Sequence, residues 1–189
     1  MRLDRCEARP PFADAAPPTG PARVVGLDFT PQMLEIARTR RLGPKSSDAR
    51  TIEYVQGDAL NLPYEDASFD VLSIAFGIRN VADPEAALRE FRRVLRPGGR
   101  LIILEFSQPK FPPARWATNL YCDQILPRTA TLISGDTSGA YRYLPQSVNT
   151  FIDRDGMARL YRDAGFTGFT LRPLTFGIAV AYRGDKPAA

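Results

Sequence analysis

The chain has 189 residues, of which 44% are hydrophobic and 24% charged, values that suit one globular domain with a buried core. It has no histidine, which excludes His-based triads and His-ligated zinc, and its two cysteines are too few for a disulfide framework. The net charge of +4 comes almost wholly from arginine, with no basic run interleaved with aromatic residues, so no nucleic-acid partner and no metal site are predicted. No apolar run approaches the ~20 residues of a membrane span, and the first residues lack a signal-type apolar stretch, so we expect a cytoplasmic protein.

The first third of the chain predicts a disordered start followed by a strand, a helix and a second strand. Residues 1–22 carry five prolines and no apolar run, so we expect them to be disordered or irregular. Arg23–Asp28 is a short predicted strand that ends in an acid. Thr30 as N-cap and Pro31 in the first turn predict a helix that continues to about residue 40. A further strand is predicted at Thr51–Val55.

The most informative stretch runs from Phe69 to Ser107 and predicts a βαβ unit. Its first strand is Val71–Phe76, Pro84 opens the helix, the Pro-Gly-Gly turn at residues 97–99 closes it, and Leu101–Leu104 is the second strand. The apolar residues of the helix recur at helical spacing: Ala87, Leu88, Phe91, Val94 and Leu95. Ligands of parallel α/β sheets bind beyond the carboxyl ends of the strands, so we expect the site there.

The last third of the chain predicts two helices and an antiparallel strand pair. Trp116–Leu126 is an apolar-rich helical stretch, and Asp153–Asp163 is a helix with Met157, Leu160 and Tyr161 facing inward. Phe166–Pro173 and Thr175–Tyr182 are predicted strands joined by a tight turn. The fold class expected from the whole pattern is α/β.

Two motifs carry a resemblance to a known family. FGIRNV (Phe76–Val81) and RVLRPGGRLIILEFS (Arg93–Ser107) resemble the ubiquinone/menaquinone biosynthesis C-methyltransferases, although that family often has Lys in place of Arg96. The match runs from about residue 24 to 184. It implies a Rossmann-like class I methyltransferase sheet with a C-terminal antiparallel strand pair, a methyltransferase domain at 23–184 and a tail at 185–189. It also implies S-adenosylmethionine-dependent C-methylation of a polyprenyl benzoquinol or a demethylmenaquinol.

The resemblance assigns cofactor contacts to five residues. Asp28, at the end of a strand, would accept hydrogen bonds from the ribose, and Met33 would pack on the adenosine; a turn residue and a core residue are the alternatives. Asp58 and Ala59 correspond to the segment that reads the adenine, although an ordinary Gly-Asp turn is also open. Ala75 stands where the family often has a hydroxyl residue, so one contact is expected to be missing.

Arg79 and Asn80 are the predicted catalytic residues. Methylation of a ring carbon needs a deprotonated quinol placed in line with the methyl donor. A cation beside the quinol oxygen favours loss of the proton, which without histidine must pass to a carboxylate, a tyrosine or water. We assign the cation to Arg79, and the holding of a quinol oxygen or of the cofactor's amino-acid end to Asn80. A surface loop residue and a helix cap are the alternatives.

Three aromatic residues are predicted to lie at the substrate. Tyr141 and Tyr143 match the family's segment over the quinol pocket, and their amphipathic rings suit an aromatic diol, although core packing is an equal alternative. Phe106 is the third, and either Phe106 or Ser107 would approach the methyl group. A membrane surface and a homodimer stay open as partners, with the protein cytoplasmic and peripheral to the inner membrane.

One expected element of the family is not found in the sequence. Class I methyltransferases carry a first strand and a glycine-rich turn about twenty residues before the acid that corresponds to Asp28, and the proline-rich start occupies that place. In the strand order 3-2-1-4-5-7-6, this strand is the central one. We therefore expect a truncated or degenerate copy, with a non-catalytic remnant that binds lipid quinone or supports a biosynthetic complex as the alternative function. A nicotinamide-dependent oxidoreductase is disfavoured, because its glycine fingerprint is equally absent.

Overall fold

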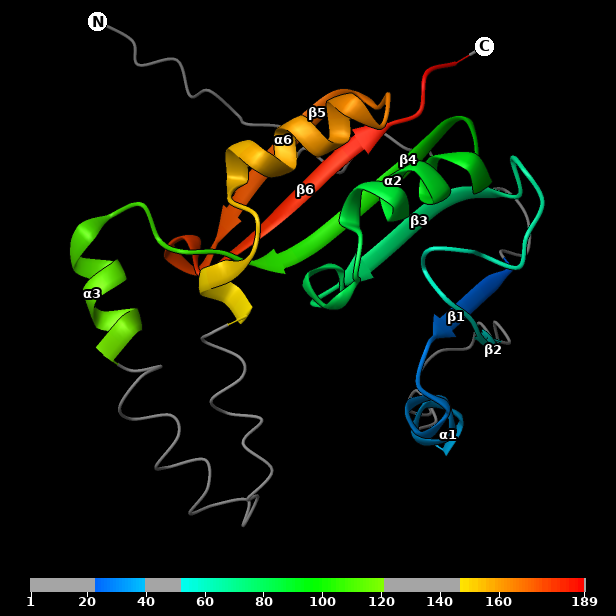
Figure 1. The fold of residues 1–189 in the computed structure, drawn as a ribbon, viewed down its shortest axis with the longest axis horizontal. Coiled ribbons are helices and arrows are strands. Elements are labelled where there is room, and N and C mark those ends of the chain that lie inside the picture. Colours follow the sequence, from blue (N-terminus) through cyan, green and yellow to red (C-terminus); the bar gives the residue numbers. More distant parts are fainter. Residues whose placement is uncertain (1–22, 40–51, 121–146, 189) are drawn as a thin grey trace, which may run out of the picture. The chain divides into compact units, whose positions relative to one another are not determined.

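The computed structural model describes residues 23–39, 52–120 and 147–188; the segment 1–22, predicted to be disordered, lies outside them. The chain divides into two compact units, which we call unit 1 (Met1–Asp58) and unit 2 (Ala59–Ala189). Figure 1 gives the element labels used below. Among the described helices, none has the length and apolar character needed to cross a bilayer.

In its described residues, unit 1 contains a parallel strand pair and one helix. Its elements are β1 (Val24–Asp28), α1 (Pro31–Thr39) and β2 (Ile52–Gln56). The two strands pair in register from Val24 opposite Ile52 to Asp28 opposite Gln56. The predicted strand, helix and strand are therefore confirmed, with boundaries that differ by one residue where the structure describes them.

Unit 2 contains a four-stranded mixed sheet in the order β3-β4-β6-β5. β3 and β4 are parallel, whereas β6 is antiparallel to both of its neighbours, β4 and β5. Its elements in the described residues are β3 (Phe69–Ala75), η1 (Ile78–Asn80), α2 (Pro84–Val94), β4 (Leu95–Phe106), α3 (Pro112–Leu120), α6 (Arg154–Asp163), β5 (Thr167–Leu174), η3 (Thr175–Gly177) and β6 (Ala179–Asp185). The predicted C-terminal antiparallel pair is confirmed.

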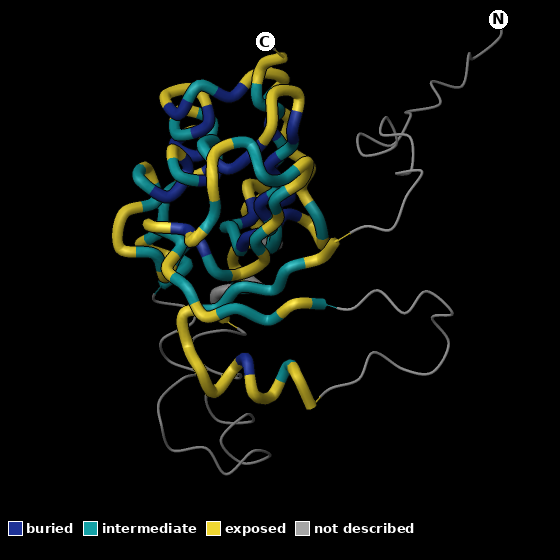
Figure 2. Tube along the Cα trace, turned by 90° about the vertical axis from the view of Figure 1, so that its right-hand side faces the viewer, coloured by how far each residue is buried: buried dark blue, intermediate teal, exposed yellow. Residues whose placement is uncertain are grey.

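The core of unit 2 lies between α2, α6 and one face of the sheet. Both helices run across the same face in Figure 1 and contact each other. Figure 2 shows that the buried residues gather in this unit, whereas α1 is almost entirely exposed. The fully buried side chains include Leu88 and Val94 of α2, Met157 and Tyr161 of α6, and Leu101, Ile103, Val180 and Tyr182 of the strands. The predicted inward residues Met157 and Tyr161 are thus confirmed, and Leu160 is half-buried.

The helix α2 ends at Val94, two residues before the end predicted from the Pro-Gly-Gly turn at residues 97–99. Leu95 is extended (φ −74°, ψ 141°) and pairs with Phe69 as the first residue of β4. Its side chain is therefore a buried side chain of the strand and not of the helix. The Pro-Gly-Gly turn lies inside this strand segment. Gly98 has φ +77° and its N–H donates to the carbonyl of Lys186, whose own N–H donates to Gly99. This pairing with the end of the chain holds the turn in the sheet.

The turn before β6 is longer than predicted. Thr175–Gly177 forms the short helix η3, in which all three residues have positive φ, so β6 begins at Ala179 and not at residue 175. The strand then continues past the predicted end at Tyr182 to Asp185, because residues Arg100–Phe106 of β4 pair with the whole of Ala179–Asp185.

The strand order agrees with the order expected for a class I methyltransferase. The order β2-β1 reproduces the 3-2 part, and β3-β4-β6-β5 reproduces the 4-5-7-6 part. Among the described residues, β1 pairs only with β2 and β3 only with β4. The central strand of the family order is thus not found in the described part of the chain.

Candidate functional site

The carboxyl ends of β3 and β4 form the edge at which a ligand site is expected, and we call it the rim of unit 2. β3 ends at Ala75, next to Leu104 of the parallel strand β4. The chain leaves β3 through Phe76 and Gly77 into η1, which contains Arg79 and Asn80, while β4 ends at Glu105 and Phe106. The two family motifs, FGIRNV and LEFS, therefore meet at this rim.

Phe76 makes the turn that brings η1 to the rim. Its φ of +55° is unusual for a bulky residue and costs on the order of 1–3 kcal/mol. Its N–H donates to Leu104 over 2.8 Å, and its ring lies 4.5 Å from that of Phe106 between centroids. The strained backbone is thus held between β3 and β4, and it directs the Phe76 carbonyl towards η1.

Arg79 is fixed by contacts on several sides. Its Nη1 donates to a carboxylate oxygen of Glu105 over 2.8 Å and to the carbonyl of Phe76 over 2.6 Å. Its Nε donates to the hydroxyl of Ser147 over 3.3 Å, and its guanidinium carbon lies 5.4 Å from the ring centroid of Phe106. The side chain is only 10% exposed. Arg79 is therefore a held cation and not a loose surface arginine.

Glu105 was not predicted as a site residue, yet it is the buried partner of Arg79. Its side chain is 1% exposed, and its oxygens accept from Nη1 of Arg79, from the Phe106 N–H over 2.8 Å and, at 3.4 Å, from the Arg79 N–H. Glu105 stands next to Phe106, and its position after the apolar run Leu101–Leu104 could have indicated it. A buried charge at a strand end is a signal of function.

Arg154 is a second buried cation at the same end of the sheet. Its Nε donates to the hydroxyl of Ser107, and its Nη2 donates to the carbonyls of Gln108 and Gly177. Tyr182 lies in the same region, and burial raises its pKa to about 12, opposed by the charge of Arg154. Arg154 thus fastens α6 to the end of β4 and to η3, and Tyr182 stays protonated at neutral pH.

The other predicted residues of unit 2 differ in where they lie and in whether the structure describes them. Asn80 and Ala75 are exposed, and Phe106 is half-buried against Phe76 and Arg79. Ala59 is half-buried at the start of the loop that leads to β3. Tyr141 and Tyr143 lie outside the described residues.

The predicted residues of unit 1 lie at the end of β1 and shortly after β2. Asp28 accepts a hydrogen bond from the Thr30 N–H over 2.8 Å through its Oδ1, so it does act as a turn residue. Met33 is 52% exposed on α1, which argues against the alternative of core packing. Asp58 is exposed just beyond β2. Unit 1 thus presents accessible polar and thioether groups after its parallel strands.

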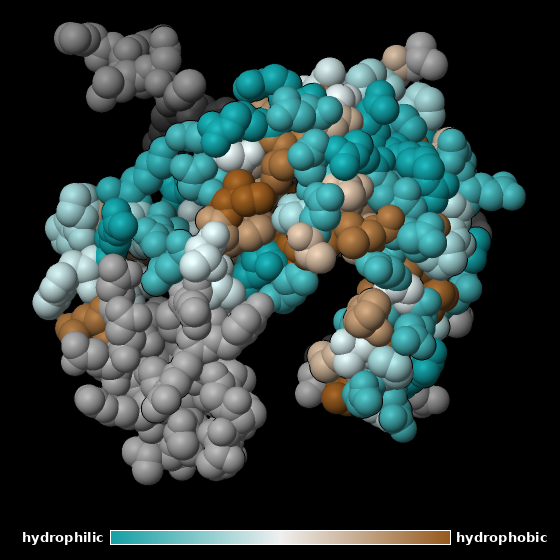
Figure 3. Space-filling model, in the orientation of Figure 1, coloured by the Kyte–Doolittle hydropathy of each residue, from teal (hydrophilic) through white to brown (hydrophobic). Residues whose placement is uncertain are grey.

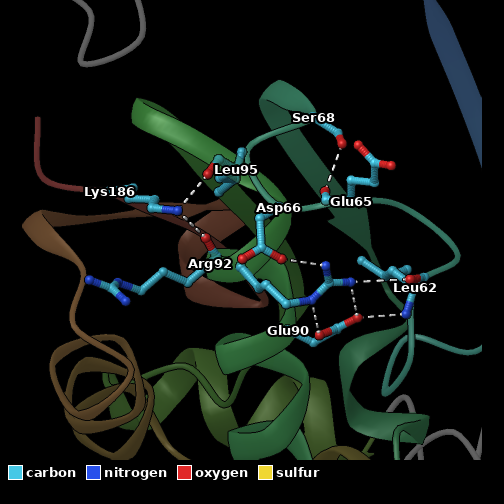
Figure 4. A network of polar contacts seen from close by, with 9 residues as sticks. Leu62, Glu65, Asp66, Ser68, Glu90, Arg92, Leu95 and Lys186 are labelled. Carbon is cyan, nitrogen blue, oxygen red and sulfur yellow. Dashed lines mark hydrogen bonds and ion pairs between the residues drawn. The ribbon is translucent and has the colours of Figure 1, made fainter. Parts of the chain in front are cut away.

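The loop between residues 60 and 67 is held on α2 by a polar network (Figure 4). Glu90 accepts from the Leu62 N–H over 2.7 Å and pairs with Arg93, which also reaches Asp66 over 2.8 Å. The hydrogen bond from Arg93 lowers the pKa of Glu90 below its usual value of 4.5, against the opposing effect of burial. Lys186 donates to the carbonyls of Arg92 and Leu95, which closes the end of the helix. The segment that follows Ala59 is therefore anchored to the core.

No group of three or more Cys, Asp or Glu side chains suited to a metal occurs in the described parts of the chain. The chemistry available at the rim is that of a held guanidinium, a buried carboxylate and two aromatic rings. Such a set can bind and orient an aromatic molecule that carries an ionisable oxygen.

The fold is that of the class I methyltransferases, as comparison with solved structures shows. A SAM-dependent methyltransferase from Thermotoga maritima matches 86% of this chain with a TM-score of 0.58 at 24% identity, and 72% of that chain is covered. A SAM-dependent methyltransferase from Methanosarcina mazei matches 88% of this chain with a TM-score of 0.59 at 22% identity, and 83% of that chain is covered.

The sequence defines the family within that fold. The model of the ubiE/COQ5 methyltransferase family matches residues 9–186, so the chain belongs to this family. The demethylmenaquinone methyltransferase of Deinococcus radiodurans is 47% identical over 86% of this chain, and the ubiquinone/menaquinone biosynthesis C-methyltransferase of Roseobacter denitrificans is 44% identical over 85%. The chain spans 65% and 63% of the length of these two relatives, respectively.

Proposed function

We propose that this chain transfers a methyl group from S-adenosylmethionine to a ring carbon of a polyprenyl quinol, either a benzoquinol or a demethylmenaquinol. The names of the relatives from Deinococcus radiodurans and Roseobacter denitrificans support both the reaction and the substrate class. The observation that carries the proposal is the held guanidinium of Arg79 beside the ring of Phe106 at the rim of unit 2. Residues 23–184 are proposed to form the methyltransferase domain and 185–189 its tail.

S-adenosylmethionine would be held mainly by residues that follow the parallel strands. The residues present fit it, since Asp28 keeps acceptor capacity beside its bond to the Thr30 N–H, and Met33 exposes its thioether. Asp58 and Ala59 would read the adenine, with Ala75 near the cofactor. When bound, S-adenosylmethionine supplies an electrophilic methyl group on sulfur.

The quinol would be oriented by the residues of the rim. Arg79 would stabilise the ionised form of a quinol oxygen, which makes the ring carbon more nucleophilic, and Asn80 would hold a quinol oxygen or the amino-acid end of the cofactor. Phe106, with Tyr141 and Tyr143, would bound the ring. Orientation of the two reactants by such groups can supply about 7–11 kcal/mol of the barrier.

We propose that the prenylated substrate is taken from a membrane surface. A second copy of this chain is the other proposed partner. The helix α3 exposes Trp116 to 69%, and Phe111 just before it is exposed to 65%. Lys110 and Arg115 are exposed beside them. Figure 3 shows a small hydrophobic patch at this helix, on the left of the view, with hydrophilic residues around it. Aromatic side chains flanked by cations suit the interface of an anionic bilayer. Loss of vesicle co-sedimentation in Trp116→Ala would support this contact, and unchanged sedimentation would contradict it.

Titration calorimetry with S-adenosylmethionine tests the proposal. The unchanged chain is expected to bind, and Asp28→Ala is expected to weaken binding at least tenfold. Glu53→Gln is the matched control, because it removes a surface carboxylate of β2 that forms an ion pair with Arg23. The absence of heat and of a thermal shift with the unchanged chain would contradict the proposal and favour the quinone-binding remnant.

A further inference from the structure

Glu105 occupies a position where the strand pattern predicts an apolar residue. Leu101, Ile103 and Glu105 alternate along β4 as fully buried residues on one face, with half-buried residues between them. A carboxylate in such a row loses its hydration and must be paired. Because a buried ion pair is seldom more stabilising than apolar residues of the same size, stability alone does not account for Glu105.

The contacts of Glu105 fix both the backbone and the side chain of Arg79. One oxygen accepts from Nη1 over 2.8 Å, and the other faces the Arg79 N–H at 3.4 Å. With the Phe76 carbonyl on Nη1 and the Ser147 hydroxyl on Nε, two of the three guanidinium nitrogens are engaged. Because the guanidinium is planar, these bonds also set the direction of Nη2. Among the hydrogen bonds that join described residues, none uses Nη2 as the donor.

The carboxylate also changes the charge that Arg79 presents. A lone guanidinium lowers the pKa of a nearby hydroxyl, whereas a guanidinium paired with a carboxylate does so less, because the two charges oppose each other. Glu105 therefore acts on two separable properties of Arg79, its direction and its effective charge.

We propose that Glu105 is the positioning residue for Arg79: it aims Nη2 at a hydroxyl of an aromatic substrate and limits how far the cation lowers the pKa of that hydroxyl. This inference rests on the proposed function for the identity of the substrate, an aromatic diol. The Glu105 carboxylate itself is buried. In this proposal it acts on the substrate only through Arg79.

The test uses 2-hydroxy-1,4-naphthoquinone, a ring analogue whose anion absorbs visible light, so that the pKa of the bound hydroxyl and the Kd are both read by absorbance. Glu105→Gln keeps an acceptor for Nη1 but removes the charge, so we expect the pKa of the bound probe to fall by about one unit. Glu105→Asp keeps the charge but shortens the reach, so we expect a similar probe pKa and a Kd raised at least fivefold.

Asp185→Asn is the matched control, because it neutralises the ion pair with Arg100 at the other end of β4. We expect it to leave both the probe pKa and the Kd unchanged. Equal probe pKa values in Glu105→Gln and the unchanged protein, or an unchanged Kd in Glu105→Asp, would overturn the inference. If Glu105→Gln does not fold, the Kd of Glu105→Asp decides. Failure of the unchanged chain to bind the probe would instead overturn the proposed substrate class, and the inference with it.

Discussion

Units 1 and 2 each contain two parallel strands and a helix, yet the helices are buried to very different extents. In β3-α2-β4, the helix buries Ala87, Leu88, Phe91 and Val94. In unit 1, α1 buries only Leu34, while Met33 and Ile36 remain exposed (Figure 2). Both helices have an apolar stripe in the sequence, so the stripe alone does not determine burial.

The difference lies in what each helix has to pack against. The helix α2 contacts both β4 and α6, is capped by the Asp83 side chain on the Ala86 N–H, and is closed by Lys186. The described partners of α1 are β1 and β2, which pair only with each other. An amphipathic helix gains its stability mainly from the surface it covers, so we expect unit 2 to carry most of the stability of the chain.

The largest expected effect comes from the same substitution placed in the two helices. Leu88→Ala removes a fully buried side chain between α2 and the sheet and is expected to cost about 3 kcal/mol. Leu34→Ala should cost about 1 kcal/mol, because the surroundings of α1 are open to water and leave little cavity. Urea unfolding monitored by amide hydrogen exchange measures the loss in the free energy of unfolding for each variant. Equal losses would contradict the proposed difference between the units.

A smaller difference is expected between two glycines in strands. A Cβ at Gly99 would lie 2.7 Å from the Arg96 carbonyl oxygen, which belongs to the backbone, so Gly99→Ala should cost about 2 kcal/mol. A Cβ at Gly26 meets the ring of Tyr54 at 3.1 Å, and a side chain can move aside, so Gly26→Ala should cost below about 1 kcal/mol. Thermal unfolding of the two variants compares them, and the reverse order would show that the strands of unit 1 are the more rigid.

The smallest expected effect depends on pH. Because the pKa of Glu90 is lowered in the folded protein, its contribution to stability is present above pH 4.5 and is lost as the pH falls through the folded pKa. Glu90→Gln should therefore cost about 1 kcal/mol at pH 7 and progressively less below pH 4.5. Glu53→Gln, in the exposed pair with Arg23, should change stability by less than about 0.5 kcal/mol at pH 7. A loss for Glu90→Gln that does not shrink in acid would contradict the role of its charge.

The sequence predicts the βαβ unit of unit 2 well because the helix start, the apolar spacing of the helix and the two apolar strands all indicate the same structure. Pro84 opens the helix as predicted, four of the five predicted apolar residues are buried from α2, and the two apolar strands pair as expected. The boundary at Leu95 was wrong because helical spacing cannot distinguish a last helical turn from a buried first strand residue. Pairing with Phe69 decides that point, and it comes from tertiary structure.

The predicted site was less complete, for a physical reason. Arg79 stands out in a polar loop after a strand, whereas Glu105 and Arg154 lie at positions that look like a strand end and a helix start. Their burial follows from contacts with Arg79, Ser107 and Gly177, which are 26, 47 and 23 residues away in sequence, respectively. No local pattern encodes such contacts. The predicted roles of Asp28, Asn80 and Phe106 stay predictions.

The most direct test of the proposed function is methyl transfer from labelled S-adenosylmethionine to a short-chain demethylmenaquinol, with the product identified by mass spectrometry. We expect the label on a ring carbon of the quinol, and we expect Arg79→Ala to lower kcat at least a hundredfold while the protein stays folded. Methyl transfer that continues at an unchanged rate in Arg79→Ala would contradict the assignment of the reaction to the rim of unit 2. If the unchanged chain forms no labelled quinol although it binds both ligands, the proposal that this chain is a methyltransferase in its own right is wrong.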